Sequence, residues 1–185
     1  LQGRADIKLP GEGWARNVGG RESVFGGPAA GAFIACDSEY EVRASGGPLQ
    51  AVIARCPAIS KTKCALVRSS DAKSETRGRD NWAREVTWLS LPSTRLLVGE
   101  VHKRGGNWSG TPPHKHDTPN PPVESRLDEF YYFRFRQPGG FGIARLYGGK
   151  DGRERLFTVR GGDTLLIPDP DLKPPTQEIL AAQGL

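Results

Sequence analysis

The 185-residue sequence is poor in several residue types, and each shortage narrows the class of protein. Its three cysteines, Cys36, Cys56 and Cys64, have no Cys-x-x-Cys spacing. This argues against a disulfide framework or a zinc knuckle and favours a reducing, cytoplasmic compartment. No apolar run approaches the ~20 residues that cross a bilayer, so we expect no membrane span. Methionine is absent, and we therefore expect the sequence to be part of a longer protein.

Helical periodicity is scarce too. Only residues 177–183 (QEILAAQ) predict a helix, and a short one. Elsewhere, short runs rich in β-branched, aromatic and leucine residues alternate with turns formed from the 24 glycines and 15 prolines. Short strands at regular spacing are typical of an all-β sandwich or barrel. We predict strands over residues 24–25, 32–35, 40–42, 49–54, 65–68, 85–89, 96–102, 129–135, 142–147, 156–159 and 164–167.

The formal net charge is +5, and basic residues crowd into residues 60–84. Such a patch can bind nucleic acid, but stacking aromatics are sparse there, with Trp82 the one candidate. We therefore favour a solvated hairpin or connection over a nucleic-acid surface. The sequence shows no helix-turn-helix pattern, which also argues against a transcription factor.

All three histidines fall within fifteen residues of each other. His114 and His116 flank Lys115, and side chains two residues apart on a strand share a face. Two imidazoles on one face are the beginning of a transition-metal site. The alternative is a pair of exposed histidines on a surface strand. His102, twelve residues before His114, is expected to be structural or exposed.

A carboxylate follows on the next predicted strand. Alternation places Glu129 and Tyr131 on the same face as Phe133 and Phe135, which is the more apolar face. A carboxylate there is costly to bury unless it is paired or binds a metal ion. Two histidines and a carboxylate form a familiar catalytic metal set. With the strand turned the other way, Glu129 is a plain surface residue, and both interpretations stay open at this point.

The sequence resembles the cupins, and within them the 5-deoxy-D-glucuronate isomerase family of myo-inositol catabolism. The motifs that carry the resemblance run over nearly the whole chain, most strongly over residues 99–168: GNWS at 106–109, PPHKHD at 112–117, LDEFYYFRF at 127–135, GFG at 140–142, RLY at 145–147, VRGGDTLLIP at 159–168 and, more weakly, GRESVFGGP at 20–28. The related ketol-isomerases that process unsaturated uronates from pectin share the block formed by PPHKHD at 112–117 and EFYY at 129–132.

This resemblance implies a bicupin, that is, two tandem jelly-roll barrels of which the second binds metal. We expect residues 1–60 to form the end of a first, metal-free barrel that is incomplete in this sequence. Residues 61–185 would form the second barrel and a tail. Such cupins hold one divalent transition metal, here Zn, Mn, Fe or Ni, through three histidines and a glutamate. The residues at the matching positions are His114, His116 and Glu129. The fourth ligand, a histidine after Pro168, has no counterpart here.

The resemblance also implies an intramolecular oxidoreductase that converts 5-deoxy-D-glucuronate to 5-dehydro-2-deoxy-D-gluconate. The proton moves between C2 and C1 through an enediolate, which a divalent cation stabilises. Tyr131 is our candidate for the proton-transfer residue. Arg145, and after it Arg155, are candidates for binding the substrate carboxylate. Lys115 is expected to support structure.

Two alternative functions stay open: a 4-deoxy-5-hexosulose-uronate ketol-isomerase of pectin breakdown and a non-catalytic cupin that binds a sugar acid. In each case the expected partner is a small sugar acid, with no nucleic acid and no membrane. Whether the protein is a homo-oligomer is left open.

Overall fold

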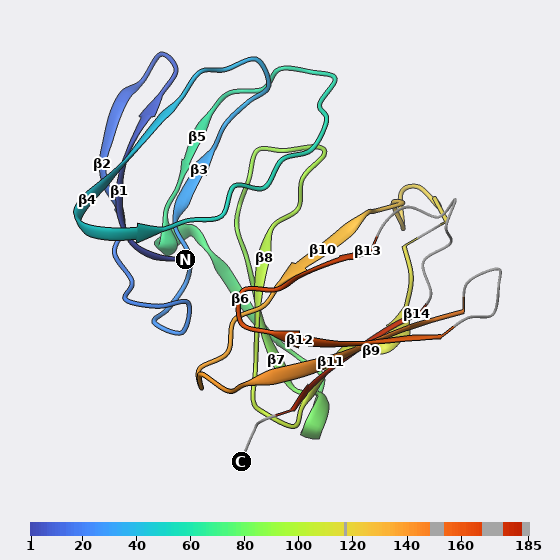
Figure 1. Ribbon diagram of the computed structural model, residues 1–185. Coiled ribbons are helices and arrows are strands. Elements are labelled where there is room, and N and C mark those ends of the chain that lie inside the picture. Colours follow the sequence, from blue (N-terminus) through green and yellow to red (C-terminus); the bar gives the residue numbers. More distant parts are fainter. Residues whose placement is uncertain (117, 149–153, 168–175, 183–185) are drawn as a thin grey trace. The chain divides into compact units, whose positions relative to one another are not determined.

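The computed structural model describes residues 1–116, 118–148, 154–167 and 176–182, with the backbone alone for residues 111 and 176–182 (Figure 1). In that part of the chain the regular elements are β-strands and two single-turn 3₁₀ helices, η1 (Ser69–Asp71) and η2 (Asp80–Trp82). The all-β fold class predicted from the sequence is therefore confirmed. The chain forms two compact units, one of residues 1–75 and 85–102 and the other of residues 76–84 and 103–185.

The first unit contains a three-stranded antiparallel sheet in the order β2 (Gly13–Gly19), β1 (Gln2–Leu9), β4 (Glu41–Gln50) (Figure 1). Strand β1 alternates strictly, with Ala5, Ile7 and Leu9 buried between exposed or half-buried polar residues. A second pair, β3 (Gly31–Phe33) and β5 (Ala65–Val67), supplies Ala32 and Leu66 to the same core. The apolar face of β1 thus lies against this pair, as the period of two requires.

The segment between β2 and β3 has no strand, and the expected strand at residues 24–25 is wrong. Arg21 holds this segment in place: its guanidinium donates to the carbonyl of Gly27 (2.7 Å) and to the carboxylate of Glu100 (2.8 Å). The side chains of that ion pair are only 9% and 19% exposed. Side-chain hydrogen bonds to carbonyls satisfy this backbone in place of a sheet partner.

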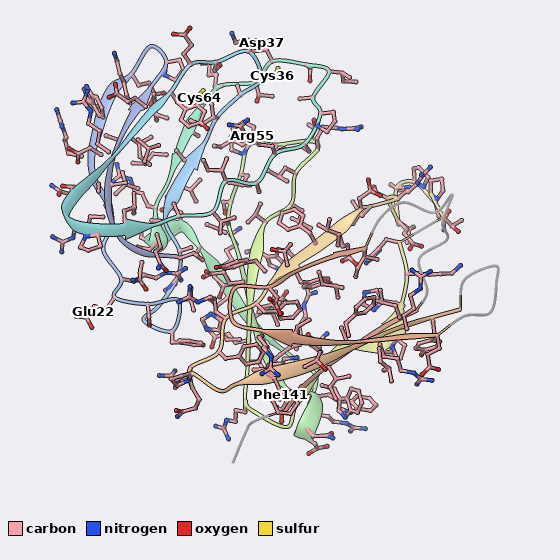
Figure 2. The ribbon with its side chains drawn as sticks, viewed as in Figure 1. Glu22, Cys36, Asp37, Arg55, Cys64 and Phe141 are labelled. Atoms are coloured by element: carbon pink, nitrogen blue, oxygen red, sulfur yellow. The ribbon has the colours of Figure 1, made fainter. Side chains whose placement is uncertain are left out.

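The free cysteines agree with the expectation that they form no disulfide framework. Cys36 follows β3, and Cys64 directly precedes β5 (Figure 2). The Sγ of Cys64 accepts a hydrogen bond from the backbone N–H of Ala35 at 3.3 Å. Cys64 also contributes to the core of the first unit, so it serves there as a small apolar residue.

Three short strands form a further sheet in the order β6 (Lys73–Arg77), β7 (Arg84–Trp88), β8 (Gly99–Lys103). In β7, Val86 and Thr87 are buried. Thr87 is satisfied by a hydroxyl–hydroxyl hydrogen bond of 2.8 Å with Ser74 of β6.

The second unit has two sheets that share one core (Figure 1). The larger sheet has the order β12 (Arg155–Arg160), β11 (Phe141–Tyr147), β14 (Thr176–Ala182), β9 (Trp108–His114). The smaller sheet pairs β10 (Glu129–Tyr132) with β13 (Thr164–Ile167). Ala144 and Leu146 from β11 contact Leu165 and Ile167 from β13, and Tyr131 packs on this cluster.

Strand β14 corrects the one predicted helix. Residues 176–182 pair with β11 on one side and with β9 on the other. A position between two strands satisfies every backbone group of a segment, and this tertiary pairing outweighs the helix propensity of Ala, Leu, Glu and Gln. Residue 183, the last of the predicted helix, lies outside the described residues. In the described part of the chain, no helix has the length and apolarity to cross a membrane.

Candidate functional site

The histidine pair lies where β9 ends. The strand runs through Pro112 and Pro113 and stops at His114, so His116 lies in the following loop. The two imidazole rings are nevertheless neighbours, with centroids 5.0 Å apart and planes at 78°. Nδ1 of His114 is 2.8 Å from the carbonyl oxygen of Pro112. If that nitrogen carries the proton, the lone pair of Nε2 is left for a ligand, as in histidines that bind metal ions.

Glu129 and Tyr131 share the inward face of β10. Both are half-buried, whereas Phe130 and Tyr132 between and after them are exposed. The predicted alternation is thus confirmed. The Tyr131 hydroxyl donates a hydrogen bond to Oε1 of Glu129 at 3.2 Å. This bond orients a carboxylate at the edge of an apolar core.

The strand registers place His114 and Glu129 on sheet faces that border the same core, with Glu129 half-buried and His114 exposed at the end of its strand. His114 pairs with residue 177 of β14, and residue 177 pairs with Leu146 of β11. Because residues paired across an antiparallel sheet share a face, His114 lies on the face of the larger sheet that carries Leu146. In the opposing sheet Glu129 pairs with Ile167. Leu146 and Ile167 belong to one core cluster.

The described residues contain no group of three or more His, Cys, Asp or Glu side chains close enough to share a metal ion. The structure therefore brings together His114 with His116, and Glu129 with Tyr131, as two separate pairs. The assignment of His114, His116 and Glu129 as ligands of one metal ion stays a prediction. Pro168 and the segment after it lie outside the described residues up to residue 175.

Arg145 lies on the other face of β11. Ala144 and Leu146 are the inward residues of this strand, so Arg145 points away from their core. Its guanidinium lies 4.5 Å from the Tyr147 ring centroid and donates to Oε2 of Glu154 at 2.8 Å. This hydrogen bond holds the pKa of the Glu154 carboxyl below its usual value. The role of Arg145 in substrate binding is still a prediction.

Arg155, the second candidate for the substrate carboxylate, pairs with Leu146 across β11 and β12. It therefore shares the inward face of the sheet and lies in the same cross-strand row as His114. Arg155 is exposed. Of the two arginines, register places Arg155 on the side of Glu129 and the histidines.

Sequence reasoning passed over Glu124, which sits in the proline-rich stretch between His116 and β10. Its Oε1 is 3.8 Å from Nδ1 of His116. Backbone hydrogen bonds fold the stretch back, from Glu124 to Asn120 and from Leu127 to His116. The sequence gives no periodic signal for this contact, because the turn alone sets it.

Comparison with known proteins identifies the family of the chain. Residues 1–176 match the KduI/IolB family. The chain belongs to this family. A relative from Geobacillus thermodenitrificans, named 5-deoxy-glucuronate isomerase, is 34% identical over 172 residues, which cover 91% of this chain and 62% of the relative. A protein of the same name from Bacillus licheniformis is 35% identical over 159 residues, 82% of this chain and 58% of its own length. The chain thus spans about three fifths of the length of these curated relatives.

A crystal structure of an IolB-like protein from Salmonella typhimurium LT2 matches the fold with a TM-score of 0.81. The two chains are 25% identical, and the match covers all of this chain and 69% of the Salmonella protein. The β-rich fold of this KduI/IolB member is therefore the fold of a solved relative.

Proposed function

We propose that this KduI/IolB protein contributes to a metal-dependent aldose–ketose isomerase that converts 5-deoxy-D-glucuronate to 5-dehydro-2-deoxy-D-gluconate in cytoplasmic inositol catabolism. The observation that carries the proposal is the register that puts exposed His114 and half-buried Glu129 on the faces of two sheets that border one core. The names of the relatives support the isomerase class. We also propose the bicupin architecture, with a partial first barrel over residues 1–60 and the metal-binding barrel over residues 61–185.

The donor atoms fit a divalent transition metal in their chemistry. His114 and His116 offer imidazole nitrogens from adjacent rings, and Glu129 offers a carboxylate on the same side of the unit. Imidazole and carboxylate suit Zn, Mn, Fe and Ni alike. When bound, the metal would polarise the substrate carbonyl and stabilise the negative charge that develops on oxygen.

The chain's own residues would orient the substrate and move the proton. Tyr131 places a hydroxyl 3.2 Å from the Glu129 carboxylate, so its proton has a defined acceptor. Such a phenol can exchange a proton with a substrate carbon or oxygen within hydrogen-bond reach. Arg155, on the inward face, would hold the sugar carboxylate by a bidentate hydrogen bond. The apolar cluster behind Tyr131 would keep bulk water from that proton.

The proposal is tested by metal content and turnover of the same variants. We expect wild-type protein to bind about one transition metal per chain and to convert 5-deoxy-D-glucuronate, followed by NMR of the sugar. His114→Ala and Glu129→Gln should weaken metal affinity by more than about a hundredfold, since even residues behind the ligands change it by 10–100-fold. The matched control is His102→Asn, because His102 contacts Phe25 in the first unit instead.

Wild-type protein that binds metal but isomerises neither 5-deoxy-D-glucuronate nor 4-deoxy-5-hexosulose-uronate would favour a non-catalytic module that binds a sugar acid. Conversion of 4-deoxy-5-hexosulose-uronate in place of 5-deoxy-D-glucuronate would favour the pectin enzyme. Unchanged metal content in both variants would overturn the assignment of the ligands.

A further inference from the structure

The loop between β9 and β10 brings one carboxylate against the histidine pair. In residues 118–128, all of which the structure describes, every residue except Glu124 is exposed. Glu124 is half-buried, and its Oε1 lies 3.8 Å from Nδ1 of His116, which is half-buried too. This separation is that of an ion pair or dipole contact, longer than a hydrogen bond. The loop therefore turns its single shielded side chain toward an imidazole.

Backbone hydrogen bonds fix both residues of this contact. The N–H groups of Val123 and Glu124 each donate to the carbonyl of Asn120 at 2.9 Å, and the N–H of Asn120 donates to the carbonyl of Glu124 at 2.9 Å. The carbonyl of His116 accepts from the N–H of Leu127 at 3.0 Å. The main chain alone makes these bonds. A substitution of the Glu124 side chain therefore leaves the donors and acceptors of the turn in place.

The same ring nitrogen faces an oxygen acceptor in both histidines. Nδ1 of His114 lies 2.8 Å from the carbonyl oxygen of Pro112, and Nδ1 of His116 faces the Glu124 carboxylate. A carbonyl and an ionised carboxylate are acceptors only. Each attracts an N–H and repels a lone pair at the nitrogen that faces it. The partner of one ring nitrogen decides which nitrogen is left for a metal ion, so both neutral rings would keep the lone pair on Nε2.

We propose that Glu124 is a positioning residue of the metal centre, whose carboxylate selects the Nδ1–H form of His116 and so leaves Nε2 of that ring as the ligand atom. This inference rests on the proposed function, in which His116 binds the metal ion. The Pro112 carbonyl has the same effect on His114. The carboxylate does more than the carbonyl, because its negative charge also makes the imidazole a stronger donor to a cation.

NMR of the ring nitrogens in isotope-labelled, metal-free protein reports the tautomer of each histidine. The chain has three histidines, so His102→Asn and His114→Ala assign the signals. At about pH 8 a free imidazole is neutral. We expect the proton of His116 to reside on Nδ1 in the wild type and to lose that preference in Glu124→Ala. Glu124→Gln keeps an acceptor oxygen and should restore most of the preference.

His114 is the internal control of that experiment. Its Nδ1 faces the Pro112 carbonyl, so its tautomer should stay the same in both Glu124 variants. Glu12→Ala is the matched control for the lost charge, because Glu12 is exposed in the turn between β1 and β2 of the first unit. An unchanged His116 tautomer in Glu124→Ala, or an equal change at His114, would overturn the proposal.

Competition for Zn²⁺ against a chromogenic chelator measures the consequence for the metal centre. Glu124→Ala should weaken Zn²⁺ affinity by about 10–100-fold, the usual effect of losing a partner behind a ligand. Glu12→Ala should leave it within about twofold, because an exposed charge far from the ligands is screened. Unchanged affinity in Glu124→Ala contradicts the positioning role. So does a loss as large as that of His114→Ala, which would make Glu124 a ligand itself.

The two measurements separate this inference from the proposed function. Wild-type protein that binds no transition metal would contradict the proposed function. The tautomers of the metal-free protein would still decide whether Glu124 sets the protonated nitrogen of His116. Conversely, wild-type metal binding and turnover with no tautomer change in Glu124→Ala would leave the proposed function standing and overturn the role of Glu124.

Discussion

Lys103 is a single residue whose environment sets a pH dependence for the whole fold. Burial and then the charge of Arg84 lower its pKa from 10.5 to about 8. Between these two values the unfolded chain binds more protons than the folded one, so the free energy of unfolding rises with pH across that window. We expect a gain on the order of 2–3 kcal/mol from pH 8 to 10.5 attributable to this residue. Urea unfolding at several pH values measures it.

Lys103→Met is the variant that isolates this effect. It keeps the aliphatic stem, removes the charge, and should flatten that part of the pH profile while raising stability at pH 7. Lys73→Met, at an exposed position of the same sheet, should leave the slope unchanged. A slope that persists in Lys103→Met would show that another group titrates there.

Individual site residues were predictable where alternation alone decides. The inward placement of Glu129 and Tyr131 followed from the apolar face of their strand. Arg145 shows the limit of that reasoning. Its strand buries Gly142 and Ala144 rather than the larger Ile143 and Tyr147. The inward face is that of Ala144 and Leu146, which pack against Leu165 and Ile167 of the partner sheet, and Arg145 lies on the other face.

Among the elements, β11 and β13 were predictable, whereas β1, β2, β6 and β9 were not among the predicted strands. The predictions over residues 142–147 and 164–167 agree with β11 and β13. Residues 46–48 (Gly-Gly-Pro) are typical of a turn, yet they lie inside β4. A bulge between Gln2 and Arg4 explains this, because it lets β1 follow the irregular stretch of β4. Strand β9 was also missed, because its two prolines and its glycine are residues typical of turns.

Gly3 makes the β1–β4 bulge testable. Its φ is +85°, and a Cβ would lie 2.3 Å from the carbonyl oxygen of Pro48. Gly3→Ala should therefore add a backbone clash to the cost of a left-handed residue and lower the free energy of unfolding by roughly 3 kcal/mol or more. Gly13→Ala, in the neighbouring strand, is the matched control.

Gly13 has a similar φ of +79°, but a Cβ there would have no other atom within 4 Å. Its substitution should cost only the conformational part, about 1–2 kcal/mol. Urea unfolding of both variants separates the two contributions. If both variants lost the same free energy of unfolding, the backbone around Pro48 would have to move away from the added Cβ at no energetic cost, which would contradict the prediction.

At the scale of the whole molecule, the two units have separate hydrophobic cores. Ile7 belongs to one and Leu146 to the other, and both are buried. The sequence predicted an all-β chain, but assigning strands to each core needed long-range pairings such as β1 with β4 and β11 with β14. Pairing partners far apart in sequence leave no local signal, since a period of two is the same whichever strand lies alongside.

Separate cores predict separate responses to cavities. Ile7→Ala and Leu146→Ala each leave a void in a buried cluster, and each should cost about 2–5 kcal/mol. We expect amide hydrogen exchange, measured by mass spectrometry, to rise in β1, β2 and β4 for Ile7→Ala and in β11 and β12 for Leu146→Ala, because protection follows the local cooperative unit. Ile59→Ala is the control, since that side chain is 91% exposed. If either core variant raised exchange equally in both sets of strands, the two units would unfold as one. A destabilising substitution in the first unit would then also increase the unfolded fraction of the second unit, which carries His114 and His116.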